Sequence, residues 1–282
     1  MKKSIVAKFS LFACVMMLLF TAAACSNENT EFMTEEEMNA YQSVYEGGLT
    51  GTIKLAFVRE FDEQADVSFE AELKFELSYP DAPITVTNFV NLVKEGFYNA
   101  PTGEKENPLT MESISSDYAL FGSKKFQIVY DEDGNEEIDE ETGDTLYEYK
   151  SIDTDYTIKG EFKSNGWKTN TIDFTKSNVL FMNLSDTTKY DSAFCQFGIT
   201  TGNISSDTMK GNYAAFGRVV STSVYRIGSD GQPSSDLGTT FDELLSTYIQ
   251  SIDNTSRDTV VKIVSITLDG DYDLGATRKL KV

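Results

Sequence analysis

The sequence predicts a mainly β protein, either a barrel or a sandwich, with two helices. Short segments in which apolar and polar residues alternate recur along the chain, and only two segments space their apolar residues as a helix does. Cysteines provide no disulfide framework, so a hydrophobic core must stabilise the protein. A chain of 282 residues is long enough for one large domain, or for one domain with insertions.

The N-terminal residues 1–24 have the pattern of a secretory signal peptide. A lysine-rich start precedes an apolar run over residues 9–20, and small residues precede Cys25. The run is shorter than the roughly 20 residues that a transmembrane helix needs. A cysteine at this place indicates a bacterial lipoprotein with a lipid on Cys25, and ordinary cleavage with Cys25 unmodified is the alternative. Residues 25–51 are predicted as a polar tether, and residues 52–282 as the folded domain.

The first part of the domain, residues 52–77, has the alternation of β-strands. Ile53, Leu55 and Phe57 alternate with polar neighbours, and residues 71–77 repeat the pattern. These segments are expected to present one face to a core.

A helix is predicted next. Apolar residues recur at helical spacing over residues 86–93, Pro83 stands where a helix begins, and Gly96 stands where it ends. A second helix is indicated near residue 240, where Thr240 and Glu243 form a capping box. Residues 259–268 then have the composition of a closing strand.

One insertion, at about residues 125–156, is strongly acidic. Residues 131–144 hold nine acids, lie between two strand-like segments and contain an Asp133-Gly134 turn, so we predict a projecting β-hairpin. Clustered carboxylates are also suited to calcium. No frame matches the EF-hand loop, however, and a solvated acidic surface is the preferred interpretation.

Composition excludes several classes of function. The formal net charge is −21, which disfavours binding to nucleic acid and to anionic lipid head groups. The chain has no histidine, so Ser-His-Asp triads, Cys-His pairs and histidine-ligated zinc are ruled out. Cys195 is predicted to be an inert buried thiol, because no histidine is present to activate it.

Five segments, in order, resemble cyclophilins, the barrel-shaped peptidyl-prolyl isomerases. They are residues 73–98, with Pro83 and Asn88-Phe89, and residues 158–162, 178–182, 191–197 and 210–220, the last with Gly217. The resemblance implies a cyclophilin-like eight-stranded antiparallel β-barrel with two capping helices. It also implies that proline-containing peptides bind, without a cofactor or a metal.

The resemblance places the catalytic position at Ser113. In the family an arginine there polarises the twisted peptide bond, and a gapless match puts Glu112 on the preceding histidine and Ser113 on the arginine. Serine is too short to reach the substrate and has no fixed charge. Gln196 is retained as a second catalytic position, where it either bonds a peptide backbone or satisfies a barrel end.

The substrate-binding positions are also altered. Phe121 replaces a glutamine that orients the arginine, Ala119 replaces a pocket methionine, and Gly198 replaces a phenylalanine of the pocket floor. The predicted substrate-binding positions are Tyr118, Phe121, Asn183, Gly198, Met209 and Tyr213.

Two functions follow from this reading. The first is a membrane-tethered peptidyl-prolyl cis-trans isomerase that assists the folding of exported proteins, with activity weakened by Ser113. The second is a catalytically inactive cyclophilin-like module that binds peptides or proteins at the cell surface. In both, the protein is a monomer attached through Cys25 to the extracytoplasmic face of the cell membrane.

Overall fold

The computed structural model describes residues 48–59, 66–101, 107–141, 143–167, 170–202, 209, 211–249 and 259–281. The signal peptide, Cys25 and nearly all of the predicted tether lie outside these residues. The strands are β1 (Leu49–Arg59), β2 (Asp66–Leu77), β3 (Leu109–Ile114), β4 (Tyr118–Ile128), β5 (Tyr147–Ser151), β6 (Tyr156–Thr157), β7 (Val179–Leu184), β8 (Ala193–Thr200), β9 (Ala214–Arg226), β10 (Thr259–Leu268) and β11 (Leu280–Lys281). The helices are α3 (Pro83–Lys94), the short 3₁₀ helix η1 (Lys163–Asn165) and α5 (Phe241–Ile249).

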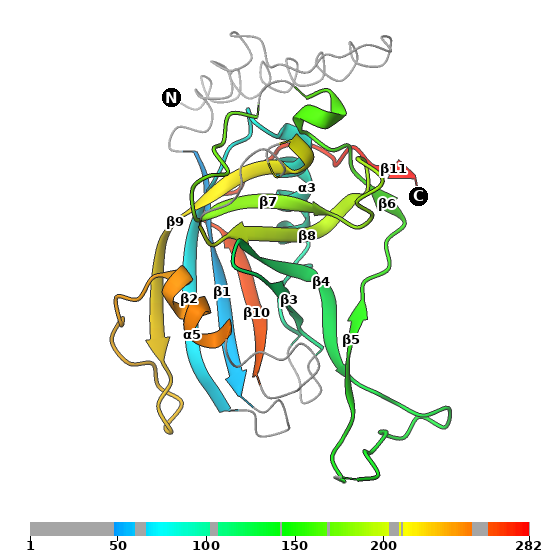
Figure 1. Ribbon diagram of the computed structural model, residues 1–282, viewed down its shortest axis with the longest axis vertical. Coiled ribbons are helices and arrows are strands. Elements are labelled where there is room, and N and C mark those ends of the chain that lie inside the picture. Colours follow the sequence, from blue (N-terminus) through cyan, green and yellow to red (C-terminus); the bar gives the residue numbers. More distant parts are fainter. Residues whose placement is uncertain are drawn as a thin grey trace, which may run out of the picture.

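Eight antiparallel strands form a closed barrel (Figure 1). Their order is β3-β10-β1-β2-β9-β7-β8-β4, and pairing between β3 and β4 closes the ring. The strand β5 pairs with β4 beyond the ring, and β6 and β11 form a separate two-stranded sheet. The predicted eight-stranded barrel is confirmed, and a sandwich is excluded because the sheet closes on itself.

Alternation along the strands fills the barrel. Ile53, Leu55 and Phe57 in β1 are fully buried, and Ile53 lies opposite Leu73 of β2. The strand β1 begins at Leu49, three residues before the predicted start of the domain, because Leu49 is itself buried in the core and pairs with β2.

The helix α3 covers part of the barrel core, as its apolar spacing predicted. Val86, Phe89 and Val90 are fully buried, and Phe89 packs edge-to-face on Phe75 of β2 with ring centroids 5.9 Å apart. After the helix, Gly96 adopts a φ of 72° and its N–H donates to the carbonyl of Val93, as a helix C-terminus requires.

The helix α5 begins with the predicted capping box. The Thr240 N–H donates to Glu243 Oε2 at 2.9 Å, and the Glu243 N–H donates to Thr240 Oγ1 at 3.2 Å. Phe241 and Leu245 at its start are buried in the barrel core. In the described part of the chain, no helix combines the length and the apolar character that crossing a bilayer requires.

The acidic insertion forms an arm that projects from the barrel (Figure 1). Its base is the β4–β5 ladder, in which Lys124 lies opposite Ser151 and Ile128 opposite Tyr147. The arm has two turns rather than the single predicted bend, because residues 136–138 form a third segment between the chain that leaves β4 and the chain that enters β5. The Glu137 N–H donates to the Val129 carbonyl, and the Glu137 carbonyl accepts from the Leu146 N–H. Within the described residues, no three acidic or cysteine side chains are grouped closely enough to hold a metal ion.

Candidate functional site

Strand register brings Ser113 into one lateral row with three other residues. Ser113 of β3 lies opposite Leu120 of β4, Leu120 lies opposite Gly198 of β8, and Gly198 lies opposite Phe181 of β7. Laterally paired residues in a sheet point to the same face. The four residues therefore share one face of the barrel wall.

That face is the outer one. Ala119, Phe197 and Met182, which alternate with the row, are buried in the barrel core. Phe181, Tyr118 and Leu120 instead belong to a second cluster outside the barrel. We call this the outer cluster: it contains Ile172, Phe174, Val179, Phe181, Met209 and Ala215, with Tyr118, Leu120 and Tyr213 packed against it.

A bulge in β3 places Glu112 on the same outer face as Ser113. Met111 lies opposite Phe121, but Ser113 lies opposite Leu120, so β3 has one extra residue at this point. Met111 points into the core, and Glu112 and Ser113 both turn outward. Each of the two side chains is partly exposed.

Phe181 occupies the space beside Gly198. A Cβ built on Gly198 would approach the Cζ atom of Phe181 to 2.1 Å and its Cε1 atom to 2.3 Å. The ring of Phe181 is 1% exposed and is held edge-on by Tyr118 and Tyr213, with centroid distances of 5.7 and 5.6 Å. The aromatic group that position 198 lacks is thus supplied from the neighbouring strand.

The segment before β7 covers the outer cluster. Phe174 packs on Phe181 with ring centroids 5.9 Å apart, and the Asn170 side chain donates to the Ala215 carbonyl at 2.6 Å. Upstream, the indole N–H of Trp167 donates to the carbonyl of Asp81 at 2.9 Å. Side-chain hydrogen bonds therefore attach this segment both to β9 and to the loop before α3.

Asp81 anchors the same segment with its carboxylate. Its Oδ1 atom accepts from the Thr171 N–H at 2.6 Å and from Thr171 Oγ1 at 2.8 Å, and its Oδ2 atom accepts from Ser78 Oγ at 2.5 Å. Asp81 is 8% exposed, so these bonds satisfy a nearly buried charge.

A chain of hydrogen bonds forms the polar end of the site. Glu112 Oε1 accepts from the backbone N–H groups of Ser123 and Lys124, and its Oε2 accepts from Ser123 Oγ at 2.7 Å and from Gln196 Nε2. The Oε1 atom of Gln196 accepts in turn from Asn183 Nδ2. The predicted positions Asn183 and Gln196 are thus brought together, and the network joins β3, β4, β8 and β7.

Two of the residues predicted at the pocket lie elsewhere. Phe121 is fully buried inside the barrel, where its ring stacks on Phe197 with centroids 5.6 Å apart and planes 17° apart. Ala119 is also fully buried in the core. The gapless match aligned both residues with positions of the family's substrate pocket, but on β4 the side chains that face the outer cluster are those of Tyr118 and Leu120. Side-chain direction alternates along a strand, so Phe121 cannot reach the outer cluster.

The remaining predicted substrate positions do meet. Tyr118, Gly198, Met209 and Tyr213 all lie in or against the outer cluster around Phe181. Sequence reasoning did not assign Glu112, Leu120 or Phe181 to the site. Phe181 was detectable in principle, because an aromatic residue at an outward position of β7 can replace the ring missing at position 198.

Two groups with shifted pKa values lie away from the outer face. Burial raises the pKa of the Cys195 thiol, which is 2% exposed in the core, as expected for an inert thiol. Burial also raises the pKa of Glu161 to about 7, against the opposing effect of the N–H groups of Ile84 and Thr85, which donate to its carboxylate at 2.8 and 2.7 Å. Glu161 thereby caps the N-terminus of α3, where the local cap residue supplies no side-chain bond.

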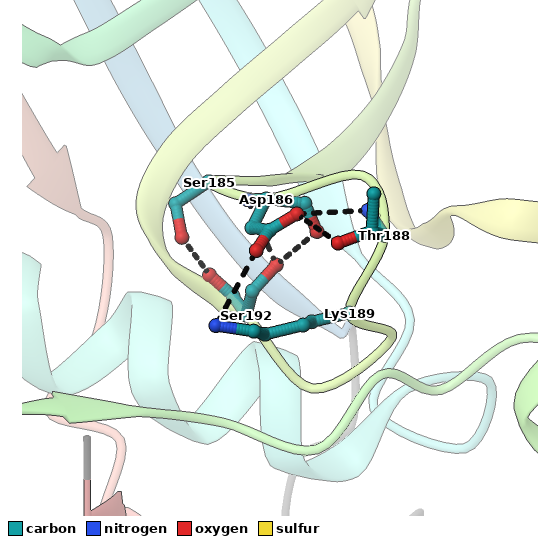
Figure 2. Close-up of polar contacts among 5 residues, drawn as sticks. All are labelled: Ser185, Asp186, Thr188, Lys189 and Ser192. Carbon is teal, nitrogen blue, oxygen red and sulfur yellow. Dashed lines mark hydrogen bonds and ion pairs between the residues drawn. The ribbon is translucent and has the colours of Figure 1, made fainter.

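The turn between β7 and β8 holds these two strands in register (Figure 2). Asp186 Oδ1 accepts from the Thr188 N–H at 2.9 Å and from Thr188 Oγ1 at 2.6 Å. Across the turn, Ser185 Oγ donates to the Ser192 carbonyl at 2.6 Å, and Ser192 Oγ donates to the Asp186 carbonyl at 2.8 Å. These bonds therefore fix the pairing of β7 with β8 at the turn that joins them, and this pairing places Phe181 opposite Gly198.

The site combines an apolar surface with neutral hydrogen-bonding groups. The apolar surface comes from the partly exposed residues packed against the outer cluster, Tyr118, Leu120 and Tyr213. Ser113 offers a hydroxyl, and Gln196 and Asn183 offer carboxamides, while the Glu112 charge is already engaged by four donors. Such a surface can bind a peptide segment and hydrogen-bond its backbone. Ser113, the predicted catalytic position, has no positive charge with which to polarise an amide.

Comparison with known proteins finds one matching family model. The family model of cyclophilin-type peptidyl-prolyl cis-trans isomerases matches residues 64–227, and no curated protein matches the chain. Two similar solved structures are crystal structures of a cyclophilin-type peptidyl-prolyl cis-trans isomerase from Cryptosporidium parvum. The first is 14% identical over 78% of this chain and 99% of that chain, with a TM-score of 0.42. The second, determined in the presence of the dipeptide Ala-Pro, is 15% identical over 79% and 99%, with a TM-score of 0.43. Since the family model covers more than half of the sequence, this chain belongs to the cyclophilin-type peptidyl-prolyl cis-trans isomerase family.

Proposed function

We propose that this protein is a slow peptidyl-prolyl cis-trans isomerase that binds proline-containing segments of exported proteins and assists their folding. Membership of the isomerase family supports cis-trans isomerisation as the reaction. The clustering of Tyr118, Met209 and Tyr213 around Phe181 supports the outer face as the place where the peptide binds. The single observation that carries the low rate is Ser113, a neutral residue on the outer face that the family resemblance aligns with an arginine.

The expected loss of rate follows from the chemistry. Rotation about an X–Pro bond needs no covalent step but faces a barrier of roughly 18–20 kcal/mol. A positive donor aimed at the twisted amide lowers this barrier, and removal of one preorganised donor costs about 10²–10³ in rate. The serine hydroxyl is neutral and short, so turnover should be slower than with an arginine by a factor of this order.

Exchange spectroscopy by NMR on an Ala-Pro tetrapeptide tests the proposal. Wild-type protein should accelerate cis-trans exchange above the spontaneous rate, and Ser113→Arg should accelerate it further. The matched control is Ser235→Arg, which adds the same charge at an exposed loop position away from the outer cluster. Equal exchange rates with and without wild-type protein, together with no gain in Ser113→Arg, would reject an isomerase.

The second candidate is a binding module without catalysis. A specific observation favours it: the Phe181 ring fills the space beside Gly198 and is itself 1% exposed, so the cluster around it is tightly packed. A peptide would then bind across the covered cluster without its proline being gripped. In an NMR titration, shifts at Tyr118 and Gln196 without any accelerated exchange would select this function.

The cellular setting is a separate part of the proposal. Export is inferred from residues 1–24, and attachment to the extracytoplasmic face of the membrane from a lipid on Cys25. Cys25→Ser should move the protein from the membrane fraction to the soluble exported fraction, and mass spectrometry of the wild type should find an acylated N-terminal cysteine. Sedimentation analysis of residues 26–282 should give a monomer.

A further inference from the structure

The orientation of the Gln196 carboxamide is set by Glu112. An ionised carboxylate only accepts hydrogen bonds, so the group that Gln196 turns towards Glu112 must be its NH₂. The Oε1 atom of Gln196 consequently points towards β7, where it accepts from Asn183 Nδ2. One charged group on β3 thus determines which atoms two neutral amides present.

The orientation leaves a defined set of groups available. In the described part of the chain, Gln196 retains one N–H that donates to no other residue, and Asn183 retains an Oδ1 atom that accepts from none. Both side chains are partly exposed. A donor next to an acceptor is complementary to a peptide backbone, which offers a carbonyl oxygen and, one residue away, an N–H.

The Glu112 carboxylate is itself held firmly. The Ser123 and Lys124 backbone N–H groups fix its Oε1 atom, and the Ser123 hydroxyl fixes its Oε2 atom. The bulge after Met111 turns Glu112 outward, which makes the contact with Gln196 possible. The carboxylate is therefore preorganised before any peptide arrives.

We propose that Glu112 is a positioning residue, which orients Gln196 so that Gln196 and Asn183 together recognise the backbone of a bound peptide. The inference rests on the proposed function, because it assumes that proline-containing peptides bind at the outer face. Glu112 acts only through Gln196 and need not touch the peptide.

Glu112→Gln tests the inference, because glutamine has the same shape but can donate as well as accept. Gln196 can then flip, and the Kd of the Ala-Pro tetrapeptide, measured by NMR titration, should rise about tenfold, while the exchange rate at saturating peptide stays the same. The side-chain NH₂ signals of Gln196 and Asn183 should shift in the free variant. Glu148→Gln is the matched control, since Glu148 accepts from Gln127 Nε2 at 2.9 Å on the arm; it should alter neither the Kd nor these signals.

A second variant keeps the test independent of how well Glu112→Gln folds. Gln196→Leu preserves every bond that Glu112 makes to β4, and it should raise the Kd about as much as Glu112→Gln does. Adding Glu112→Gln to Gln196→Leu should then raise the Kd no further. An unchanged Kd in Gln196→Leu, or further weakening in the double variant, would overturn the inference. If the wild-type protein binds no peptide, the proposed function itself fails. If the wild type binds peptide and the variants bind it equally well, only the role of Glu112 is rejected.

Discussion

The ring of Phe181 lies so close to Gly198 that a Cβ on the glycine would come within 2.1 Å of the ring's Cζ atom. Phe181 comes from β7 and Gly198 from β8, and their direct pairing in register brings them together. The missing side chain at position 198 and the ring at position 181 are therefore two parts of one packing arrangement.

Gly198→Ala is expected to destabilise the protein because the Phe181 ring cannot move away. Tyr118, Tyr213 and Phe174 hold the ring on three sides. Overpacking of this kind costs about 1–3 kcal/mol in the free energy of unfolding. In a Phe181→Ala background the ring is absent, so Gly198→Ala should cost much less. Urea denaturation of the four proteins measures this coupling, and an equal cost in both backgrounds would contradict the arrangement.

Phe121→Gln should destabilise the protein strongly, since Phe121 lies inside the barrel against Phe197 and Phe241. Loss of a buried phenylalanine costs about 3–5 kcal/mol, and the buried amide adds to this. Leu120→Gln is the matched control, because Leu120 is the outward, partly exposed neighbour. Its cost should be clearly smaller. A larger loss in Leu120→Gln would reverse our assignment of the two faces of β4.

Glu161 should make stability depend on pH. Its pKa is raised from 4.5 to about 7 by burial, so the folded state binds a proton that the unfolded state releases. Its stabilising contribution is thus fully present below about pH 4.5 and is lost as the pH rises through 7. At 1.36 kcal/mol per pKa unit, the free energy of unfolding of the wild type should fall by about 3 kcal/mol relative to that of Glu161→Gln as the pH rises from about 4.5 to above 7.

Urea denaturation of wild type and Glu161→Gln from pH 4.5 to 8 measures this difference. Glu243→Gln supplies a contrast of opposite sign, because the hydrogen bond from the Thr240 backbone N–H lowers the pKa of Glu243. The contribution of Glu243 should therefore be lost as the pH falls. Parallel curves for wild type and Glu161→Gln would show that the buried carboxyl does not hold a proton in the folded state.

Asp81→Ala should loosen the segment that covers the outer cluster. The substitution removes the bonds from Ser78 and Thr171 to a nearly buried carboxylate, at an expected cost of about 2–4 kcal/mol. Trp167, the only tryptophan, is 6% exposed, and its fluorescence should shift to longer wavelength as it gains water. Thr175→Ala is the control: Thr175 is exposed, and its hydroxyl donates to Asp173 Oδ1 at 2.7 Å, so the substitution should leave the spectrum unchanged. A wild-type spectrum in Asp81→Ala would show that the anchor is dispensable.

Local patterns in the sequence were sufficient to predict several of the strands and helices. Alternation over residues 52–77, helical spacing between Pro83 and Gly96, and the capping box at Thr240 each predicted an element that the structure contains. These signals depend on neighbouring residues in the chain, so they can be recognised without knowledge of the fold. The family resemblance then supplied the closed order of the strands.

By itself, the sequence determined the main strands, the two helices and the acidic arm, and its family resemblance implied the closed barrel. The assignment of Ser113 to the catalytic position stays a prediction. Only the tertiary structure decided which side chains share the outer face: the bulge beside Glu112, the inward direction of Phe121 and the ring of Phe181 over Gly198. The physical reason is that side chains alternate along a strand, so a shift of one residue exchanges core and surface. Such a shift is set by pairing with distant strands, and the residues next to it in the sequence do not encode it.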